Sequence, residues 1–335
     1  MAGAQLERWR RAFVAMAIGL ALALMGAGSV WLDQSRGGEQ GATGPVFTDW
    51  AATVREAAAM ELVTPDGILS LERNEDGVWR DARRGGYPVR AERIAQLDSA
   101  LGGLRFERAM TRDAEKFDRL GLGETASRAT LRDSQGGVLA DLFVGTSNAG
   151  RLYIRPADTG RAFAARGEAP PLTGPSDWLG LDFLQLDASS ILRAEIMPET
   201  GAPYRLEKTI AGARHFTLSE PDGWNLVTAG AGNGVATATA ALRFRDVRPA
   251  DEVTGIVLAR HAATTVSGLG VIMTIRDHEG ASWAVMEFRG LTEDAEPRAA
   301  RFNAITSGWA YQLSEDAYER LTRPLNQIAD VEANP

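Results

Sequence analysis

Three histidines, His215, His261 and His278, are the side chains best suited to metal binding or to acid–base chemistry at neutral pH. A zinc-hydrolase helix carries two histidines four residues apart, and here no histidine lies three or four residues from another. His278 stands between Asp277 and Glu279, where we expect a solvated hairpin turn. The chain has no cysteine, which excludes thiolate metal ligands, cysteine nucleophiles and disulfides. We therefore predict no metal site and no cofactor.

Two short motifs resemble sites of nucleophilic catalysis or phosphate binding. Gly280–Ala284 differs at one position from the G-x-S-x-G elbow, which needs a strand before its serine and a helix after it. A turn precedes Ser282 and a strand follows it, so we predict an ordinary strand residue. Gly230–Gly234 lacks the lysine and spacing of a phosphate loop and predicts a flexible loop. We therefore predict no catalytic residue and a protein that is not an enzyme.

Tryptophans and repeated arginines are the other candidates for binding. Tryptophans could line a glycan or peptide groove, although packing in the core or on a sheet is the simpler interpretation. Those beyond the first 47 residues are Trp50, Trp79, Trp178, Trp224, Trp283 and Trp309. Arg105 with Arg243, and Arg132 with Arg276, recur at matched places and could mark a partner surface. A structural role in two copies of one fold is the simpler explanation of these pairs.

The matched arginines belong to a longer internal repeat. The hexamer Leu104–Ala109 begins Leu-Arg-Phe and returns as Leu242–Val247. Further matches pair Met60–Val63 with Ala194–Met197, Leu71–Arg73 with Leu206–Lys208, Asp76–Trp79 with Asp222–Trp224, Leu131–Asp133 with Ile275–Asp277, Leu139–Gly145 with Ala284–Gly290, and more loosely Tyr153 with Tyr311. Their order never breaks, so we predict collinear copies with insertions and deletions in their loops. The first copy is placed at residues 48–187 and the second at 188–335.

Each copy predicts antiparallel hairpins with one main helix, an α+β class. Met60–Thr64 and Ile68–Arg73 read as strands around Pro-Asp-Gly, and a helix after Pro88 has apolar residues at helical spacing up to Leu104. The other predicted elements are hairpins at Ala129–Val144 and Val271–Phe288, a short edge strand at Tyr153–Ile154, a final helix capped by Ser314 and carrying Tyr318, Leu321 and Leu325, and a polar tail from Ala329. A proline-rich stretch at Ala169–Pro175 is the clearest break between the copies.

The N-terminus predicts a membrane anchor. Residues 1–11 carry Arg8, Arg10 and Arg11 and are predicted to be a cytoplasmic tail. Residues 12–32 contain no charge and would span about 30 Å as a helix, the thickness of a hydrocarbon core. Residues 33–47 predict a flexible linker. A cleaved signal peptide is the competing interpretation, but its apolar region is usually shorter and is followed by a small-residue cleavage site.

The whole pattern resembles domain-of-unknown-function family 4340. The resemblance is carried by one N-terminal span, hairpins ending Leu-Glu-Arg and Asp-Gly-Val-Trp, a helix ending Leu-Arg-Phe, and then Gly-Leu-Gly and an Arg-Asp hairpin. It implies a membrane-anchored extracytoplasmic protein, of a kind often encoded beside ABC-type export or gliding-motility permease components. The family offers no catalytic residues to carry over.

These observations favour a non-enzymatic accessory or scaffold protein of an ABC-type export or envelope complex. It would be single-pass in a bacterial inner membrane, with the bulk of the chain periplasmic and a permease or other envelope protein as partner. The alternative is a periplasmic binding module for cell-wall glycan or peptide, and a hydrolase is a third hypothesis. The net charge of −8 gives no reason to expect a nucleic-acid partner.

Overall fold

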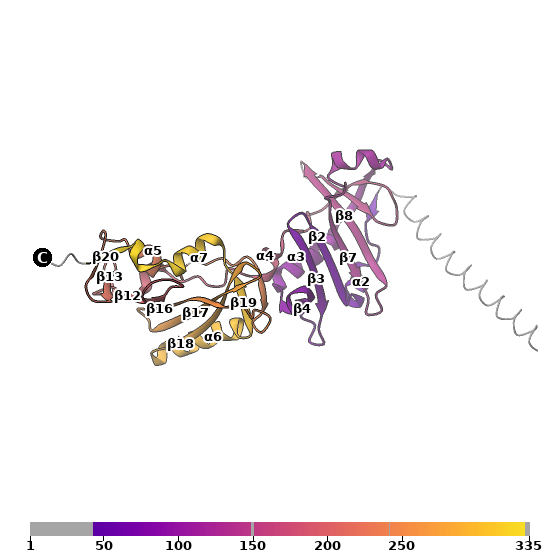
Figure 1. Cartoon of the computed structure of the whole chain (residues 1–335). Coiled ribbons are helices and arrows are strands. Elements are labelled where there is room, and N and C mark those ends of the chain that lie inside the picture. Colours follow the sequence, from indigo (N-terminus) through magenta and orange to yellow (C-terminus); the bar gives the residue numbers. More distant parts are fainter. Residues whose placement is uncertain (1–42, 149–150, 241, 332–335) are drawn as a thin grey trace, which may run out of the picture. The chain divides into compact units, whose positions relative to one another are not determined.

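The computed structural model describes residues 43–148, 151–240 and 242–331 and is α+β, with antiparallel sheets (Figure 1). The chain divides into two compact units. The first comprises the described chain up to Arg73 together with Glu92–Leu172, and the second comprises Asn74–Ala91 together with the chain from Thr173 onward. The main division thus falls in the predicted proline-rich break rather than at the predicted boundary between residues 187 and 188.

The first unit is a twisted sheet with two helices. Its strands are β1 (Gly44–Pro45), β2 (Ala59–Thr64), β3 (Gly67–Arg73), β6 (Arg105–Ala109), β7 (Ser127–Arg132), β8 (Val138–Asn148), β9 (Arg151–Pro156) and β10 (Phe163–Arg166), and its helices are α2 (Trp50–Glu56) and α3 (Ala91–Gly103). The strands follow the order β1-β6-β10-β9-β8-β7-β2-β3. The predicted β2–β3 hairpin is confirmed, and Gly67 closes it at a φ of 141°, which only glycine adopts readily.

Helix α3 shows how the core of the first unit is built. Leu97, Leu101 and Leu104 are at most 1% exposed, as their helical spacing predicts. Gly102 lies where Trp50 of α2 packs, because a Cβ atom there would stand 2.4 Å from the indole Cδ1. The indole Nε1 also donates to Asp98 Oδ1 at 2.6 Å. A glycine that weakens a helix thus lets two helices meet.

The second unit contains a larger set of elements around one main sheet. Its strands are β4 (Trp79–Asp81), β5 (Tyr87–Pro88), β11 (Ile191–Met197), β12 (Tyr204–Glu207), β13 (Thr217–Glu220), β14 (Trp224–Leu226), β15 (Val247–Pro249), β16 (Val257–Thr265), β17 (Leu269–His278), β18 (Ala281–Gly290), β19 (Trp309–Gln312) and β20 (Ala329–Val331), and its helices are α4 (Pro175–Leu179), α5 (Asn233–Ala236), α6 (Glu296–Thr306) and α7 (Glu315–Thr322). The main sheet has the order β13-β12-β11-β16-β17-β18-β19-β15, and β14 pairs with β20.

The two sheets share one strand order. In the first unit the succession is β3-β2-β7-β8-β9-β10-β6, and in the second it is β12-β11-β16-β17-β18-β19-β15. By position β16 and β17 therefore correspond to β7 and β8. The predicted match of the Asp133 hairpin with the Asp277 hairpin is shifted by one strand, because the Asp277 turn joins β17 to β18.

The Asn74–Ala91 segment precedes α3 in sequence but belongs to the second unit. Arg84 lies between two carboxylates, with its Nε 2.5 Å from Asp246 and an amine nitrogen 2.5 Å from the fully buried Asp81. Tyr87 is 3% exposed and packs edge-on against the Trp309 ring, with ring centroids 4.9 Å apart. Contacts therefore group this segment with the second unit, although the predicted first repeat, residues 48–187, includes it.

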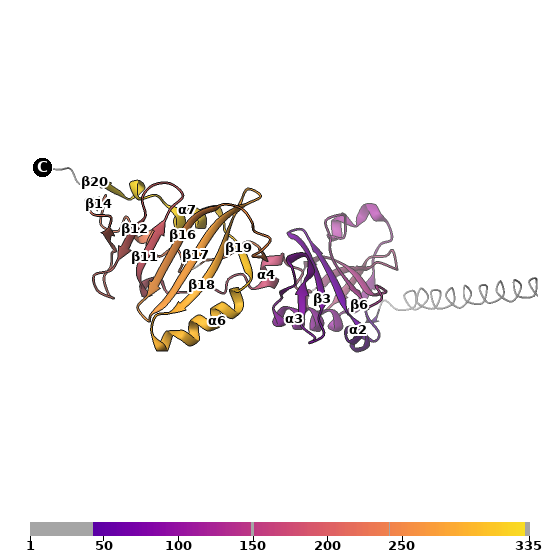
Figure 2. The ribbon, with the colours of Figure 1, turned by 60° about the horizontal axis from the view of Figure 1, so that its bottom comes forward.

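Helix α6 covers the part of the β18 edge, in the second unit, that no strand pairs with. On this edge of β18 only the first part of the strand, Trp283–Val285, pairs with β19. Helix α6 runs alongside the rest of β18 (Figure 2). The Asn303 side chain accepts from the Phe288 amide at 2.9 Å and donates to the Phe288 carbonyl at 2.7 Å. One amide side chain thus replaces the backbone of a neighbouring strand.

Several predicted segments have a different structure. The end of the predicted linker forms β1 and pairs with β6, and the start of the predicted polar tail forms β20. Strand β9 is not an edge strand, because it lies between β8 and β10. Helix α7 ends at Thr322, so Leu325 lies in the following 3-10 turn, η6 (Leu325–Gln327). In each case backbone pairing or a proline decided the structure, and the local pattern did not show it.

Within the described residues, no helix is long and apolar enough to cross a membrane. The predicted cytoplasmic tail at residues 1–11, the predicted span at 12–32 and most of the predicted linker lie outside the described residues.

Candidate functional site

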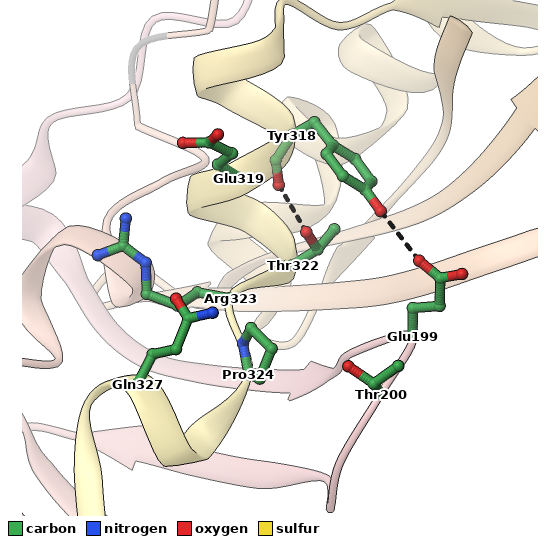
Figure 3. A pocket seen from close by; sticks show the side chains of 8 residues that line it. All are labelled: Glu199, Thr200, Tyr318, Glu319, Thr322, Arg323, Pro324 and Gln327. Atoms are coloured by element: carbon green, nitrogen blue, oxygen red, sulfur yellow. Dashed lines mark hydrogen bonds between the residues drawn. The ribbon is translucent and has the colours of Figure 1, made fainter. Parts of the chain in front are cut away.

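A polar pocket of about 340 Å³ in the second unit is the candidate site (Figure 3). It lies between the loop that follows β11, the end of α7 and the turn η6. Its lining residues are Glu199, Thr200, Tyr318, Glu319, Thr322, Arg323, Pro324 and Gln327. Two carboxylates, one guanidinium, one phenol and one amide therefore surround a single hollow.

The position of the pocket follows from where α7 begins and ends. Ser314 caps the helix as predicted, accepting from the Ala317 amide at 3.2 Å. Pro324 ends it, since the residue before a proline avoids the helical region, and Arg323 has a ψ of 125°. The Tyr204 hydroxyl donates to the Arg323 carbonyl at 2.6 Å and fixes this exit.

The side chains that line the pocket combine charged groups with hydrogen-bonding groups. The Tyr318 hydroxyl donates to Glu199 Oε2 at 3.2 Å, and the two residues point toward each other across the pocket (Figure 3). Burial, followed by the charge of Glu199, raises the pKa of Tyr318, so its hydroxyl stays neutral at neutral pH. Glu199, Glu319 and Arg323 offer hydrogen bonds and charges of both signs. This arrangement suits a polar, charged ligand.

His261 lies on β16 beneath α7 and is fully buried. Its Nδ1 donates to the Leu321 carbonyl at 3.0 Å, because a carbonyl oxygen only accepts. Its Nε2 is buried without a partner among the described residues. Burial lowers the pKa of His261 to about 4, so the ring is neutral at neutral pH. It acts as a core residue that fixes the end of α7.

The other predicted candidates lie elsewhere. His215 Nδ1 lies 3.1 Å from the Asn233 amide, and His278 Nε2 lies 3.1 Å from Arg248. Across the described chain, no cluster of three or more histidine, aspartate or glutamate side chains could hold a metal ion. Ser282 is a strand residue of β18, as predicted. Gly230–Gly234 is a turn whose end enters α5.

The tryptophans and repeated arginines do not line the pocket. Trp178 and Trp283 are buried, and the other four described tryptophans are half-buried. Arg132 donates to the Gly136 carbonyl at 3.2 Å and Arg276 to the Gly255 carbonyl at 3.0 Å, which are structural roles. Arg105 and Arg243 are exposed beside the buried Leu104 and Leu242.

The pocket residues were missed in the sequence because each has an ordinary local explanation. Glu199 stands two residues after the repeat segment Ala194–Met197, and Tyr318 belongs to the predicted final helix. The one available signal was that a tyrosine on a partly buried face needs a hydrogen-bond partner for its hydroxyl. No pattern identifies Glu199 as that partner, since 119 positions separate the two residues.

Comparison with known proteins identifies the family. The family described as domain of unknown function (DUF4340) matches residues 79–256, just over half of the chain and parts of both units. A search of curated proteins found no match. The chain therefore belongs to the DUF4340 family, as the resemblance of its motifs predicted.

Proposed function

We propose that the chain is a non-catalytic, membrane-anchored accessory or scaffold protein of an ABC-type export or envelope complex, with the two units on the periplasmic side. The shared strand order of the two units carries this proposal, because it favours the predicted tandem duplication of one sheet. A repeated sheet gives one chain two related surfaces, which suits a protein that holds partners together. The uncharged segment at residues 12–32 supports the anchor.

Photo-crosslinking in the native membrane tests this proposal. A photoreactive amino acid is placed at Ile256 or Ile210, which are 71% and 69% exposed, and purification of full-length protein follows. We expect crosslinked permease or ATPase subunits from at least one apolar position. The matched control is the polar and exposed Asp316. Recovery of no permease, ATPase or other envelope protein above the control would contradict the proposal.

The pocket favours a second function, a binding module for cell-wall peptide or glycan. The pocket is built from α7, η6 and the loop after β11, and the shared strand order contains no first-unit counterpart of α7 after β10. A feature added to one copy indicates a role beyond the common framework. The carboxylates of Glu199 and Glu319 suit the amine of a peptide, and Arg323 suits its carboxylate.

Binding of muropeptides to the full-length protein tests this second function. Glu199→Gln and Arg323→Gln are each expected to weaken binding about tenfold or more, because each removes a charge-assisted hydrogen bond. Asp316→Asn on the outer side of α7 is the control and should bind as the wild type does. Equal binding by all variants, or none by the wild type, would exclude the pocket as this site.

A further inference from the structure

A second feature, in the first unit, lies on the face of the sheet opposite its core. Arg155 is on β9, where the flanking Ile154 and Pro156 are buried and point inward. Its guanidinium carbon lies 3.8 Å from the centre of the Phe143 ring and 5.1 Å from the centre of the Phe117 ring. Stacking on two aromatic rings holds the planar group in one orientation. We call these three residues the Arg155 stack.

The Arg155 stack contains a guanidinium without an anionic partner. The Arg155 side chain makes no hydrogen bond or ion pair with another described residue, and its Nε is shielded from solvent. The neighbouring Arg128 lies over the same Phe143 ring at 4.8 Å, but Asp141 holds it with two hydrogen bonds of 2.7 and 2.5 Å. Two guanidinium groups therefore share one ring, and only one of them has a carboxylate.

Asp141 forms hydrogen bonds with Arg128 and not with Arg155. Both of its oxygens are occupied by Arg128, and Oδ1 also accepts from the Thr130 hydroxyl at 3.3 Å. Burial and then the charge of Arg128 lower the pKa of Arg155, which Asp141 offsets in part. The environment thus disfavours the cation, and an added anion would relieve this cost.

The backbone around the stack fixes Phe117 in place. Phe117 lies between two 3-10 turns, η2 (Ala114–Lys116) and η3 (Asp118–Leu120). The end of η3 rests on β8 at Gly145, where a Cβ atom would stand 2.2 Å from the Leu120 carbonyl oxygen. Only a glycine allows this approach. The loop that carries Phe117 is therefore seated on the sheet, and the stack is formed before any ligand arrives.

We propose that the Arg155 stack is a recognition site for an oxyanion, a carboxylate or phosphate group bound by the open edge of the Arg155 guanidinium. A planar guanidinium binds such groups through two parallel hydrogen bonds. The two phenylalanine rings cover part of the guanidinium, and the less polar surroundings strengthen its interaction with an anion. This site lies in the first unit and is independent of the accessory role and of the pocket.

Titration of the full-length protein tests the site. Inorganic phosphate and acetate are added separately, and the Arg155 Nε–Hε signal is followed by NMR with assignment by the Arg155→Lys variant. We expect saturable shifts of this signal in the wild type, and calorimetric titration of each variant to give binding that is tenfold to a hundredfold weaker in Arg155→Met. Arg155→Lys keeps the charge but loses the planar fork, and should bind more weakly than the wild type. Vesicles with anionic headgroups then show whether a membrane can supply the phosphate.

Arg151→Met is the matched control, because Arg151 lies on the same strand, is exposed and carries the same charge. It should bind phosphate and acetate as the wild type does. The proposal is wrong if neither anion shifts the Arg155 signal saturably. It is also wrong if Arg155→Met and Arg151→Met lower binding equally, since surface charge alone would then account for the effect. Unchanged thermal unfolding of both variants ensures that each is compared as a folded protein.

Discussion

His261 is the residue whose burial has the clearest consequence for pH dependence. Its folded pKa of about 4 lies below the ordinary value of 6.5, so the unfolded chain binds a proton more readily than the folded one. The stability that the neutral ring supports is therefore fully present above pH 6.5 and is lost as the pH falls toward 4. The buried Nε2 has no hydrogen-bond partner among the described residues, so a proton added there would find no acceptor.

We expect the free energy of unfolding to fall by about 2 kcal/mol from this group between pH 8 and pH 5. Urea unfolding of the wild type and of His261→Leu at both values measures it. The variant should lose this part of the pH dependence, while His215→Gln should retain it. The same slope in His261→Leu and in the wild type would show that another group is responsible.

Arg84 shows the cost of separating a buried ion pair. Burial alone would lower the pKa of Arg84, but its bonds to Asp246 and Asp81 raise it above the ordinary value. Asp81 is fully buried, so Arg84→Met leaves a carboxylate without its cation, and we expect a loss of about 3 kcal/mol in unfolding free energy. Chemical denaturation measures this, with the exposed Arg83→Met as control. A loss below 1 kcal/mol would mean that water reaches Asp81.

At the scale of elements, α3 contains two glycines with opposite roles. Gly102 faces the Trp50 ring, whereas Gly103 has no atom within 4 Å of where a Cβ would stand. Helix propensity favours alanine at both positions by up to about 1 kcal/mol. At Gly102 the methyl group would displace the indole ring, so steric overlap outweighs propensity there.

Gly102→Ala is therefore expected to destabilise the protein by roughly 1–3 kcal/mol, and Gly103→Ala to stabilise it by roughly 0.5–1 kcal/mol. Thermal unfolding of the two variants beside the wild type gives both signs in one experiment. Stabilisation by both substitutions would show that α2 moves away from α3 at little cost.

The sequence predicted elements well where local chemistry decides them. The β2–β3 hairpin follows from alternating residues around a Pro-Asp-Gly turn, and α3 follows from Leu97, Leu101 and Leu104. The match between the Asp133 and Asp277 hairpins was wrong. An Arg-Asp pair with a glycine three residues later indicates only a turn, and any hairpin can contain such a turn. The place of β9 inside its sheet depends on pairing with β10, which no local pattern contains.

At the scale of the whole molecule, the chain passes between the units three times, at Arg73, at Ala91 and at Leu172. The sequence showed the last crossing as a proline-rich break, but the Asn74–Ala91 segment gave no such sign. Its assignment depends on Arg84 meeting Asp246, 162 positions away. The pocket depends in the same way on Glu199 and Tyr318. Contacts between distant positions are what a single sequence leaves open.

The Asn74–Ala91 segment should be required for folding of the second unit. A chain of residues 173–335 loses Arg84 beside Asp246 and Tyr87 beside Trp309 and Tyr311. We expect it to unfold at a lower temperature than the same chain with residues 74–91 joined to its N-terminus by a Gly/Ser linker. Calorimetry of the two chains compares them directly. Equal transition temperatures would show that residues 173–335 form a complete unit without the segment.

The contact of Asn303 with β18 also has a consequence for how copies of this protein can associate. A sheet edge with free amides and carbonyls is a template on which a second chain can add its own strand and begin a fibril. Along β18 the Asn303 amide occupies both groups of Phe288 and sets α6 beside the remaining edge. Asn303 and α6 therefore cover an edge on which a second chain could otherwise add a strand, a role that no catalytic or binding assay would reveal.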